Sequence, residues 1–500
     1  MLENRLSPLD ATFLQLENDD SNMCVGGADV FAGPAPSYDE LLVELDRRMD
    51  AVPNFRHRRV DVPLGLGRSR WADAEDFRIE NHIRHTALPS PGRAEQLQSV
   101  FSRIMSNPIN HEHSPWELWL VEGLEGGRFA LLHKMHHALV DGIASVQVLE
   151  QLFSANPDGD ETIEARDIGP RPAPSKLRLT IESLVERTLV PEAVGLAKGA
   201  VTDPKGTAES AVRTAAGLIG LGRAAIKQAP ATPYNKPVGP ARSFAWQRES
   251  MSDVKALKDA LGGSVNDVVL TTMAATLGSD LRERGVDTAG LEIYAFIPVS
   301  VRSDDGTGDL GNKVSGLKVA LPVGERDPLE RFARVHAAMD ELKSSPQALG
   351  ASAAVDSTGL VPAALFEAVA GVGDIQRYVN TVITNVPGPR NKLYLLGREL
   401  EDVFGFVPLA GNLAMNTAIV SYVDKIGFGF CADPSVVPNV DHMAPALHVA
   451  FEELAAAAKV ELSFQKKPKR KPAASKKKPA AKKKKPTAAK KKPSAKKKAS

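Results

Sequence analysis

The stretch His133-Lys-Met-His136-His137-Ala-Leu-Val-Asp141-Gly142 lies where the hydrophobic pattern changes from that of a strand to that of a helix. Before its histidine pair, the apolar run Ala130–Lys134 predicts a strand. After it, apolar residues at helical spacing predict a helix over Gly142–Phe153. The histidine pair is therefore expected in a short loop where a strand ends and a helix begins. Short strands and helices alternate in the same way over residues 1–158.

This junction suits acid–base chemistry. A histidine at the end of a strand can present a ring nitrogen to a cavity, and its ordinary pKa near 6.5 lets it take up a proton near neutral pH. Asp141 follows four residues later and can fix the loop through ionic or backbone bonds. Gly142 lets the chain turn sharply into the helix. The alternative is that these are ordinary polar residues at the end of a strand.

A metal site is a third interpretation of the histidines, and we expect no resident metal. His133 and His136 would face opposite sides of a continuing strand. No cysteine or carboxylate lies near them at ligand spacing. His111 and His113 are expected in a loop.

Several other catalytic signatures are absent from the sequence. There is no Gly-x-Ser-x-Gly elbow, no Walker phosphate loop and no glycine-rich dinucleotide fingerprint. Without a protein nucleophile, the simplest chemistry is direct transfer, in which a base deprotonates a bound acceptor that attacks a bound acyl donor.

Charge divides the chain into two parts. Of its 62 Lys and Arg residues, 18 lie in residues 466–500, which contain no acid, so the remainder carries 44 basic against 61 acidic side chains. Residues 465–500 consist almost entirely of Lys, Ala, Pro, Ser and Thr, cannot bury apolar surface, and are predicted to be disordered. A basic tail of this kind favours a polyanionic partner, either an anionic lipid surface or nucleic acid.

The two cysteines, Cys24 and Cys431, are too few for a disulfide framework or a cysteine zinc site, which suits a reducing cytoplasm. The N-terminus lacks the pattern of a secretory signal, and no run of 18 apolar residues occurs. We expect a cytoplasmic protein whose contact with membranes or lipid droplets is peripheral.

The 500 residues suggest two large domains. An N-terminal domain is predicted over 1–158 and a C-terminal domain over 243–464, with a proline-rich linker over 159–242 between them. The linker has two long helical patterns, at Lys176–Lys198 and Thr207–Gln228. The strands predicted in the second domain are Ile293–Pro298, Gly316–Leu321, Val379–Thr384 and Ile426–Cys431.

An ordered set of motifs resembles the bacterial wax ester synthase/acyl-CoA:diacylglycerol acyltransferase family over nearly all of residues 5–460. HHxxxDG alone also marks the condensation domains of peptide synthetases, so the set, and not this one motif, is specific. Ser114-Pro115-Trp116 departs from the family's usual Pro-Leu-Trp. The other motifs are Ser7-Pro-Leu-Asp-Ala-Thr-Phe-Leu-Gln-Leu-Glu17, Asn81-His-Ile-Arg-His85, Leu88-Pro-Ser-Pro-Gly92, Asn235-Lys-Pro-Val-Gly-Pro240, Asn266-Asp267, Pro298-Val-Ser-Val-Arg302, Gly311-Asn312 and Asn385-Val-Pro-Gly-Pro389.

The resemblance implies two chloramphenicol-acetyltransferase-like α/β domains with a tunnel between them that reaches the histidines. It implies that His137 is the general base, with His136 beside it, and that Asp141 is structural and pairs with Arg302. Asn266 is a candidate for orienting the acceptor or stabilising the thioester oxyanion. It competes with the interpretation that Asn266 caps a helix. Asn385–Pro389 is expected to be a structural turn.

The implied activity is O-acyl transfer from acyl-CoA to diacylglycerol, with long-chain alcohols as further acceptors. The coenzyme A thioester is then a substrate, and no cofactor is expected. Two alternatives stay open: a condensation-type acyltransferase with a carrier-protein donor, and a nucleic-acid- or lipid-body-binding protein that acts through its tail. The sequence does not identify the residues that bind coenzyme A, the acyl chain length or the oligomeric state.

Overall fold

The computed structural model describes residues 6–65, 68–140, 142–159, 173–188, 228–300, 314–343 and 378–463. All of them belong to one compact unit, Met1–Ser463. The tail predicted to be disordered lies outside the described residues. The same is true of the second helical pattern of the linker, Thr207–Gln228, except for its last residue.

The first sheet has six strands in the order β11-β12-β1-β6-β5-β4. The predicted strand before the histidines is confirmed as β6, which pairs antiparallel with both β1 and β5. The other contacts are antiparallel between β1 and β12 and parallel between β4 and β5. The strands span Cys24–Phe31 (β1), Ile83–Ala87 (β4), Trp116–Glu122 (β5), Phe129–His136 (β6), Tyr394–Leu395 (β11) and Arg398–Phe406 (β12).

Helices cover both faces of this sheet, which explains why β6 is buried along its length. Leu131 and Met135 belong to a core shared with α2 (Tyr38–Arg48) and α4 (Gly142–Leu152). Ala130 and Leu132, on the opposite face, belong to a core shared with α3 (Ala94–Ser106). A strand between two apolar layers buries every side chain, and all eight residues of β6 are buried.

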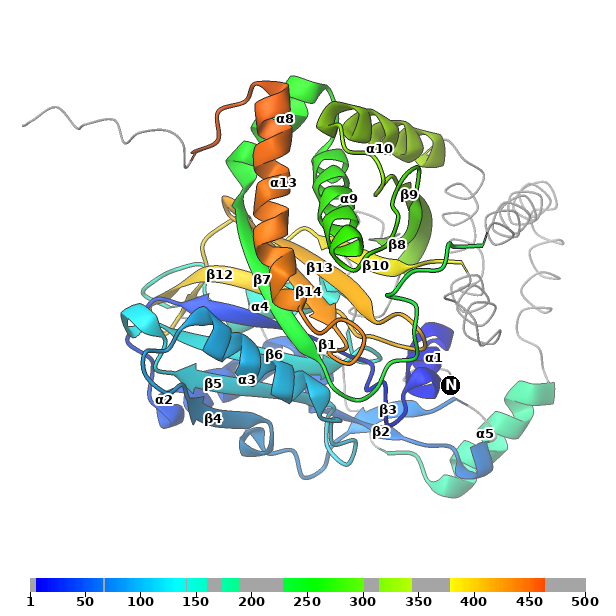
Figure 1. The fold of residues 1–500 in the computed structure, drawn as a ribbon. Helices are drawn as coiled ribbons and strands as arrows, with labels where there is room; N and C mark the ends of the chain where they lie inside the picture. The colour runs from blue at the N-terminus through cyan, green and yellow to red at the C-terminus, as the bar shows by residue number, and fades with distance from the viewer. Residues whose placement is uncertain are drawn as a thin grey trace, which may run out of the picture. The chain divides into compact units, whose positions relative to one another are not determined.

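The second sheet has the order β7-β14-β13-β10-β8-β9. Figure 1 shows helices α8, α9, α10 and α13 gathered against it, and their apolar side chains form one core with its strands. Four of these strands, β8, β9, β10 and β14, confirm the strand predictions made for this half of the chain. The elements span Ser243–Ser250 (β7), Ile293–Ser300 (β8), Val314–Leu321 (β9), Thr381–Val386 (β10), Met415–Tyr422 (β13), Lys425–Ala432 (β14), Met251–Leu261 (α8), Val265–Glu283 (α9), Pro328–Lys343 (α10) and Met443–Ala458 (α13).

Strands β11 and β12 come from the second half of the chain but complete the first sheet. Strand β12 also lies against β13 and β14. At this crossing the backbones approach so closely that a Cβ at Gly429 would lie 2.0 Å from the Gly405 carbonyl oxygen. Glycine is therefore required where the two sheets meet. The domain boundaries predicted from the sequence did not anticipate that β11 and β12 join the sheet of the first half of the chain.

The remaining elements lie outside the two main sheets. Helix α1 (Pro8–Leu16) is capped by Ser7, and the hairpin of β2 (His57–Val60) and β3 (Arg70–Asp73) forms a small sheet. Helix α5 (Lys176–Thr188) confirms the beginning of the first helical pattern predicted in the linker. No helix among the described residues is both long and apolar enough to cross a bilayer. Short 3-10 turns occupy Met49–Ala51, Pro53–Arg56, Pro63–Gly65, Ile79–Asn81, Glu125–Gly127 and Val440–His442.

Candidate active site

The histidine pair lies where β6 ends, as predicted. The His136 N–H donates to the Pro115 carbonyl oxygen over 2.9 Å, and the His137 N–H donates to the Met23 carbonyl oxygen over 3.0 Å. These acceptors precede the two strands that flank β6. A tight turn follows, in which the Leu139 N–H donates to the His136 carbonyl oxygen. The backbone that carries both imidazoles is thus hydrogen-bonded to the segments on either side of β6.

The His137 ring is half-buried and stacks on the ring of Phe13. The two ring centroids lie 4.0 Å apart, and the ring planes differ by 11°. Phe13 belongs to α1, which is anchored at its start by a capping box between Ser7 and Asp10. The stacking therefore restrains the plane of the His137 ring.

The His136 side chain is fully buried and chemically distinct from His137. Its Nδ1 accepts a hydrogen bond from the Ala138 N–H over 3.0 Å. Burial lowers the pKa of His136 well below 6.5, and the nearby His111 and His137 lower it further. The ring is therefore neutral near pH 7. Because Nδ1 accepts a proton donor, the ring's own proton resides on Nε2.

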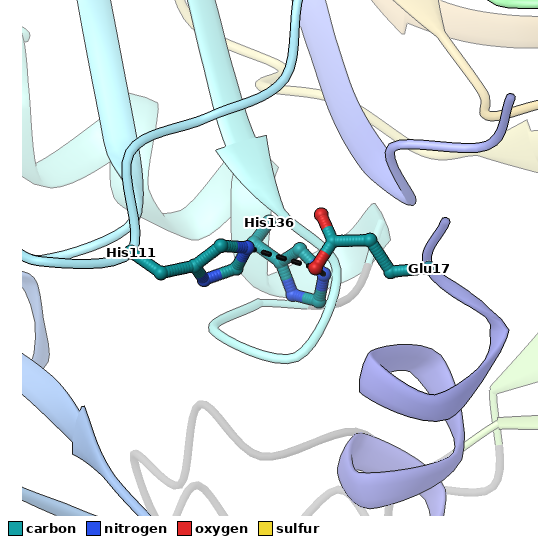
Figure 2. Close-up of side chains that lie close together, drawn as sticks. All are labelled: Glu17, His111 and His136. Carbon is teal, nitrogen blue, oxygen red and sulfur yellow. Dashed lines mark ion pairs between the residues drawn. The ribbon is translucent and has the colours of Figure 1, made fainter. Parts of the chain in front are cut away.

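Figure 2 shows that Glu17 and His111 approach this Nε2. Glu17 Oε2 lies 2.8 Å from His111 Nε2 and 3.7 Å from His136 Nε2. Sequence reasoning missed this cluster because its members come from three distant segments, and His111 was expected only as a loop residue. Phe13 and Glu17 do lie in the Ser7–Glu17 motif, but the motif indicated no role for either.

Two histidines and a carboxylate are ligands that zinc accepts, and their ligand atoms lie within 4.8 Å of one another. A metal-bound histidine normally donates its other ring N–H to an acceptor. His136 instead accepts at Nδ1, so the Nε2 that faces the cluster carries a proton and offers no lone pair. In this orientation the cluster does not fit a metal ion.

His133 lies on the other face of β6, as the sequence predicted. Its Nδ1 is 2.9 Å from Asp29 Oδ2, and both side chains are buried. Helix α4 begins at Gly142, also as predicted. Asp141 and Arg302 lie outside the described residues, so their pairing stays a prediction.

Asn266 lies in the first turn of α9, and the alternative that it caps this helix is wrong. The N-cap is Ser264, whose Oγ accepts from the Asp267 N–H over 3.2 Å. Asp267 Oδ2 accepts in return from the Ser264 N–H. The Asn266 carbonyl oxygen instead accepts from the amide of Asn385 over 2.5 Å. This bond orients Asn266 so that its own NH₂ group is the end that can donate to a substrate.

The contact of Asn385 with Asn266 could not be predicted from the sequence. The segment Asn385–Pro389 was expected to be a structural turn. Asn385 lies on β10, in the interior of the second sheet, and reaches the first turn of α9. The motif that contains it therefore supports the candidate residue Asn266.

Comparisons with known proteins agree with these features. Residues 6–269 match the family model of the wax ester synthase/diacylglycerol acyltransferase catalytic domain, and residues 310–455 match that of the corresponding C-terminal domain. The chain is 28% identical to the probable diacylglycerol O-acyltransferase tgs1 of Mycobacterium tuberculosis over 468 residues, which cover 91% of this chain and 96% of that protein. It is 30% identical to the probable diacylglycerol O-acyltransferase tgs2 of the same organism, covering 90% and 98%.

Two solved structures have a fold similar to that of this chain. A wax ester synthase/diacylglycerol acyltransferase from Marinobacter aquaeolei VT8 superposes with a TM-score of 0.65 at 27% identity, covering 91% of this chain and 100% of that one. The starter condensation domain of rhizomide synthetase, solved with C8-CoA, superposes with a TM-score of 0.58 at 14% identity, covering 91% and 94%. The second likeness concerns the fold alone. Together they confirm the predicted α/β fold class.

Proposed function

The chain belongs to the wax ester synthase/diacylglycerol acyltransferase family, and from this premise we propose that it transfers an acyl group from acyl-CoA to the free hydroxyl of diacylglycerol. The observation that carries the proposal is the difference between the two neighbouring histidines. His136 is buried, neutral and bonded to the backbone, whereas His137 is half-buried and stacks on Phe13. One ring is thus built into the loop, and the proposal assigns proton exchange to the other ring, which is not fully buried.

In the proposed reaction, a ring nitrogen of His137 takes the proton of the acceptor hydroxyl. The hydroxyl oxygen attacks the carbonyl carbon of the thioester, and an ester bond forms as the bond from carbon to sulfur breaks. The sulfur of coenzyme A leaves as a thiolate and takes the proton from the imidazolium. Such a base contributes a factor of about 10² to 10⁴ in rate.

Asn266 is the proposed donor to the oxygen that becomes negative during the attack. Its carbonyl oxygen is held by Asn385, so its NH₂ group is oriented before the substrate arrives. One oxyanion donor of this kind is worth about 3 kcal/mol of transition-state stabilisation. Asp141 is proposed to act structurally through Arg302.

Wax ester synthesis from long-chain alcohols is proposed as a second activity, because the matching family model covers both reactions. The experiment is an acyl-transfer assay with purified protein and acyl-CoA, with diacylglycerol and hexadecanol as acceptors side by side. Ester formation from diacylglycerol supports the main proposal. Transfer that occurs only when a carrier protein replaces coenzyme A would favour the condensation-type alternative.

The enzyme is proposed to work at the surface of a membrane or lipid droplet, where its water-insoluble acceptors dissolve. The 18 basic residues of 466–500 support an electrostatic contact. A basic residue near an anionic membrane contributes about 1 kcal/mol of attraction. Nucleic acid is the other polyanion that such a tail would bind, without sequence preference.

Truncation tests this tail. A chain that ends after Gln465 should bind anionic vesicles more weakly than the full chain, and added salt should weaken the full chain's binding. Turnover on dispersed substrate should be the same for both, because the candidate site lies in the body. Equal vesicle binding by the two forms would contradict the membrane role, and preferential binding of the full chain to DNA would favour nucleic acid.

A further inference from the structure

We propose that Glu17 is a positioning residue of the histidine loop, and that it acts through His136. The inference rests on the proposed function, since positioning matters only if His137 is the base. Glu17 follows directly on α1 and ends that helix as its C-cap. The same short helix therefore delivers Phe13 to the ring of His137 and a carboxylate to the ring beside it.

The first argument is the state of the His136 ring. Its Nδ1 accepts from the Ala138 N–H, so Nε2 bears the proton. That nitrogen is buried and has no hydrogen bond to any other described residue. The Glu17 carboxylate oxygen, 3.7 Å away, is the acidic group that faces it. A buried N–H without an acceptor is costly, and the electrostatic attraction of a carboxylate at this distance reduces that cost.

The second argument is the path from this carboxylate to the base. His136 binds the backbone N–H of Ala138, the residue that follows His137. The backbone N–H of His137 is bound by Met23. The attraction between Glu17 and the His136 ring therefore acts on the chain on both sides of His137. Displacing a catalytic group by about 1 Å can reduce the rate about 100-fold.

His111 completes the arrangement by lying against the same carboxylate. Its Nε2 lies 2.8 Å from the same carboxylate oxygen, and its ring meets that of His136 edge-on with centroids 5.3 Å apart. One carboxylate oxygen therefore faces two imidazoles. The opposing hypothesis for the same three side chains is a bound divalent metal, which would need the proton of His136 on Nδ1 instead.

The kinetic experiment compares Glu17→Gln, Glu17→Asp and the control Glu112→Gln in the full chain. Glu112 lies in the same loop as His111, but its side chain is exposed. We expect Glu17→Gln to lower kcat about 10- to 100-fold, with the KM for acyl-CoA changed less than about twofold. Glu17→Asp, which keeps the charge, should restore part of the loss. Glu112→Gln should match the wild type.

Two kinetic results would overturn the proposal. One is a kcat of Glu17→Gln within about twofold of the wild type, given that a positioning loss should exceed about tenfold. The other is equal loss in the Gln and Asp variants together with a lowered melting temperature, which would mean that Glu17 only supports the fold. A wild-type chain without any transferase activity would instead refute the proposed function.

The second experiment does not depend on activity. In protein labelled with ¹⁵N at histidine, the ring of His136 should show the neutral form with its proton on Nε2. The ring with its proton on Nδ1, or stoichiometric zinc in the purified full chain that is lost in Glu17→Gln, would overturn the proposal in favour of a metal site. This measurement also decides the matter if Glu17→Gln fails to fold.

Discussion

Burial gives two adjacent and chemically identical side chains, His136 and His137, different environments. The motif predicted the histidine loop and its place at the end of a strand, and both predictions are confirmed. The surroundings of each ring could not be predicted. Phe13, Glu17 and His111 reach the loop through tertiary packing, and sequence spacing carries no information about such contacts.

The buried histidines predict an acid-sensitive fold. Burial lowers the pKa of both His136 and His82 below 6.5. As the pH falls through 6.5, the unfolded chain takes up protons at these residues before the folded chain does. Their contribution to stability is therefore present above about pH 6.5 and is lost as the pH falls, by up to about 1.4 kcal/mol per group and pH unit.

Urea titrations at about pH 7.5 and about pH 5.5 measure this effect, since the window brackets the ordinary histidine pKa. The free energy of unfolding should be lower at the acidic pH. The variant His136→Asn should show a smaller loss between the two conditions. An equal loss in the variant would mean that His136 is not responsible.

At the level of elements, periodicity was sufficient for the strands of the second sheet and for the helix after the histidines. It could not predict the strand exchange in which β12 joins β1, because pairing between distant strands leaves no local pattern. The start of α9 shows a similar limit. Asn266 resembled a cap in the sequence, yet Ser264 caps the helix, and Asn266 instead meets Asn385 on a neighbouring strand.

The contact between α9 and β10 predicts a catalytic defect in Asn385→Ala. Without Asn385 the amide of Asn266 is free to rotate, so we expect kcat to fall about tenfold or more. The loss of one hydrogen bond should lower stability by only about 1 kcal/mol. Steady-state kinetics and thermal unfolding measure the two effects.

Asn391→Ala provides the control, because Asn391 is exposed a few residues further along the same segment. It should leave both kcat and stability unchanged. A variant Asn385→Ala with wild-type kcat would remove the support that this contact gives to Asn266.

At the scale of the whole molecule, the two sheets are joined by side chains as well as by β12. Arg242, just before β7, is buried, and burial lowers its pKa. Its guanidinium donates to the Asp20 carbonyl oxygen over 2.5 Å, and its backbone N–H donates to Ser106 Oγ over 2.8 Å. The residue thereby ties the start of the second sheet to two segments around the first.

Arg242→Ala should therefore lower the free energy of unfolding by about 1 to 3 kcal/mol, because the hydrogen bonds that its charged guanidinium donates are lost. Chemical denaturation of the full chain measures this. Arg390→Ala, at an exposed position, should change stability by less than about 0.5 kcal/mol. Equal stability of the two variants would mean that Arg242 does not hold the sheets together.

The central claim of this account is that His137 is the general base of acyl transfer from acyl-CoA to diacylglycerol. Its most direct measurement is the kcat of His137→Ala, with circular dichroism to verify the fold. The account predicts a loss of about 10² to 10⁴ in kcat, with an unchanged circular dichroism spectrum. Near-wild-type turnover by the folded variant would contradict it.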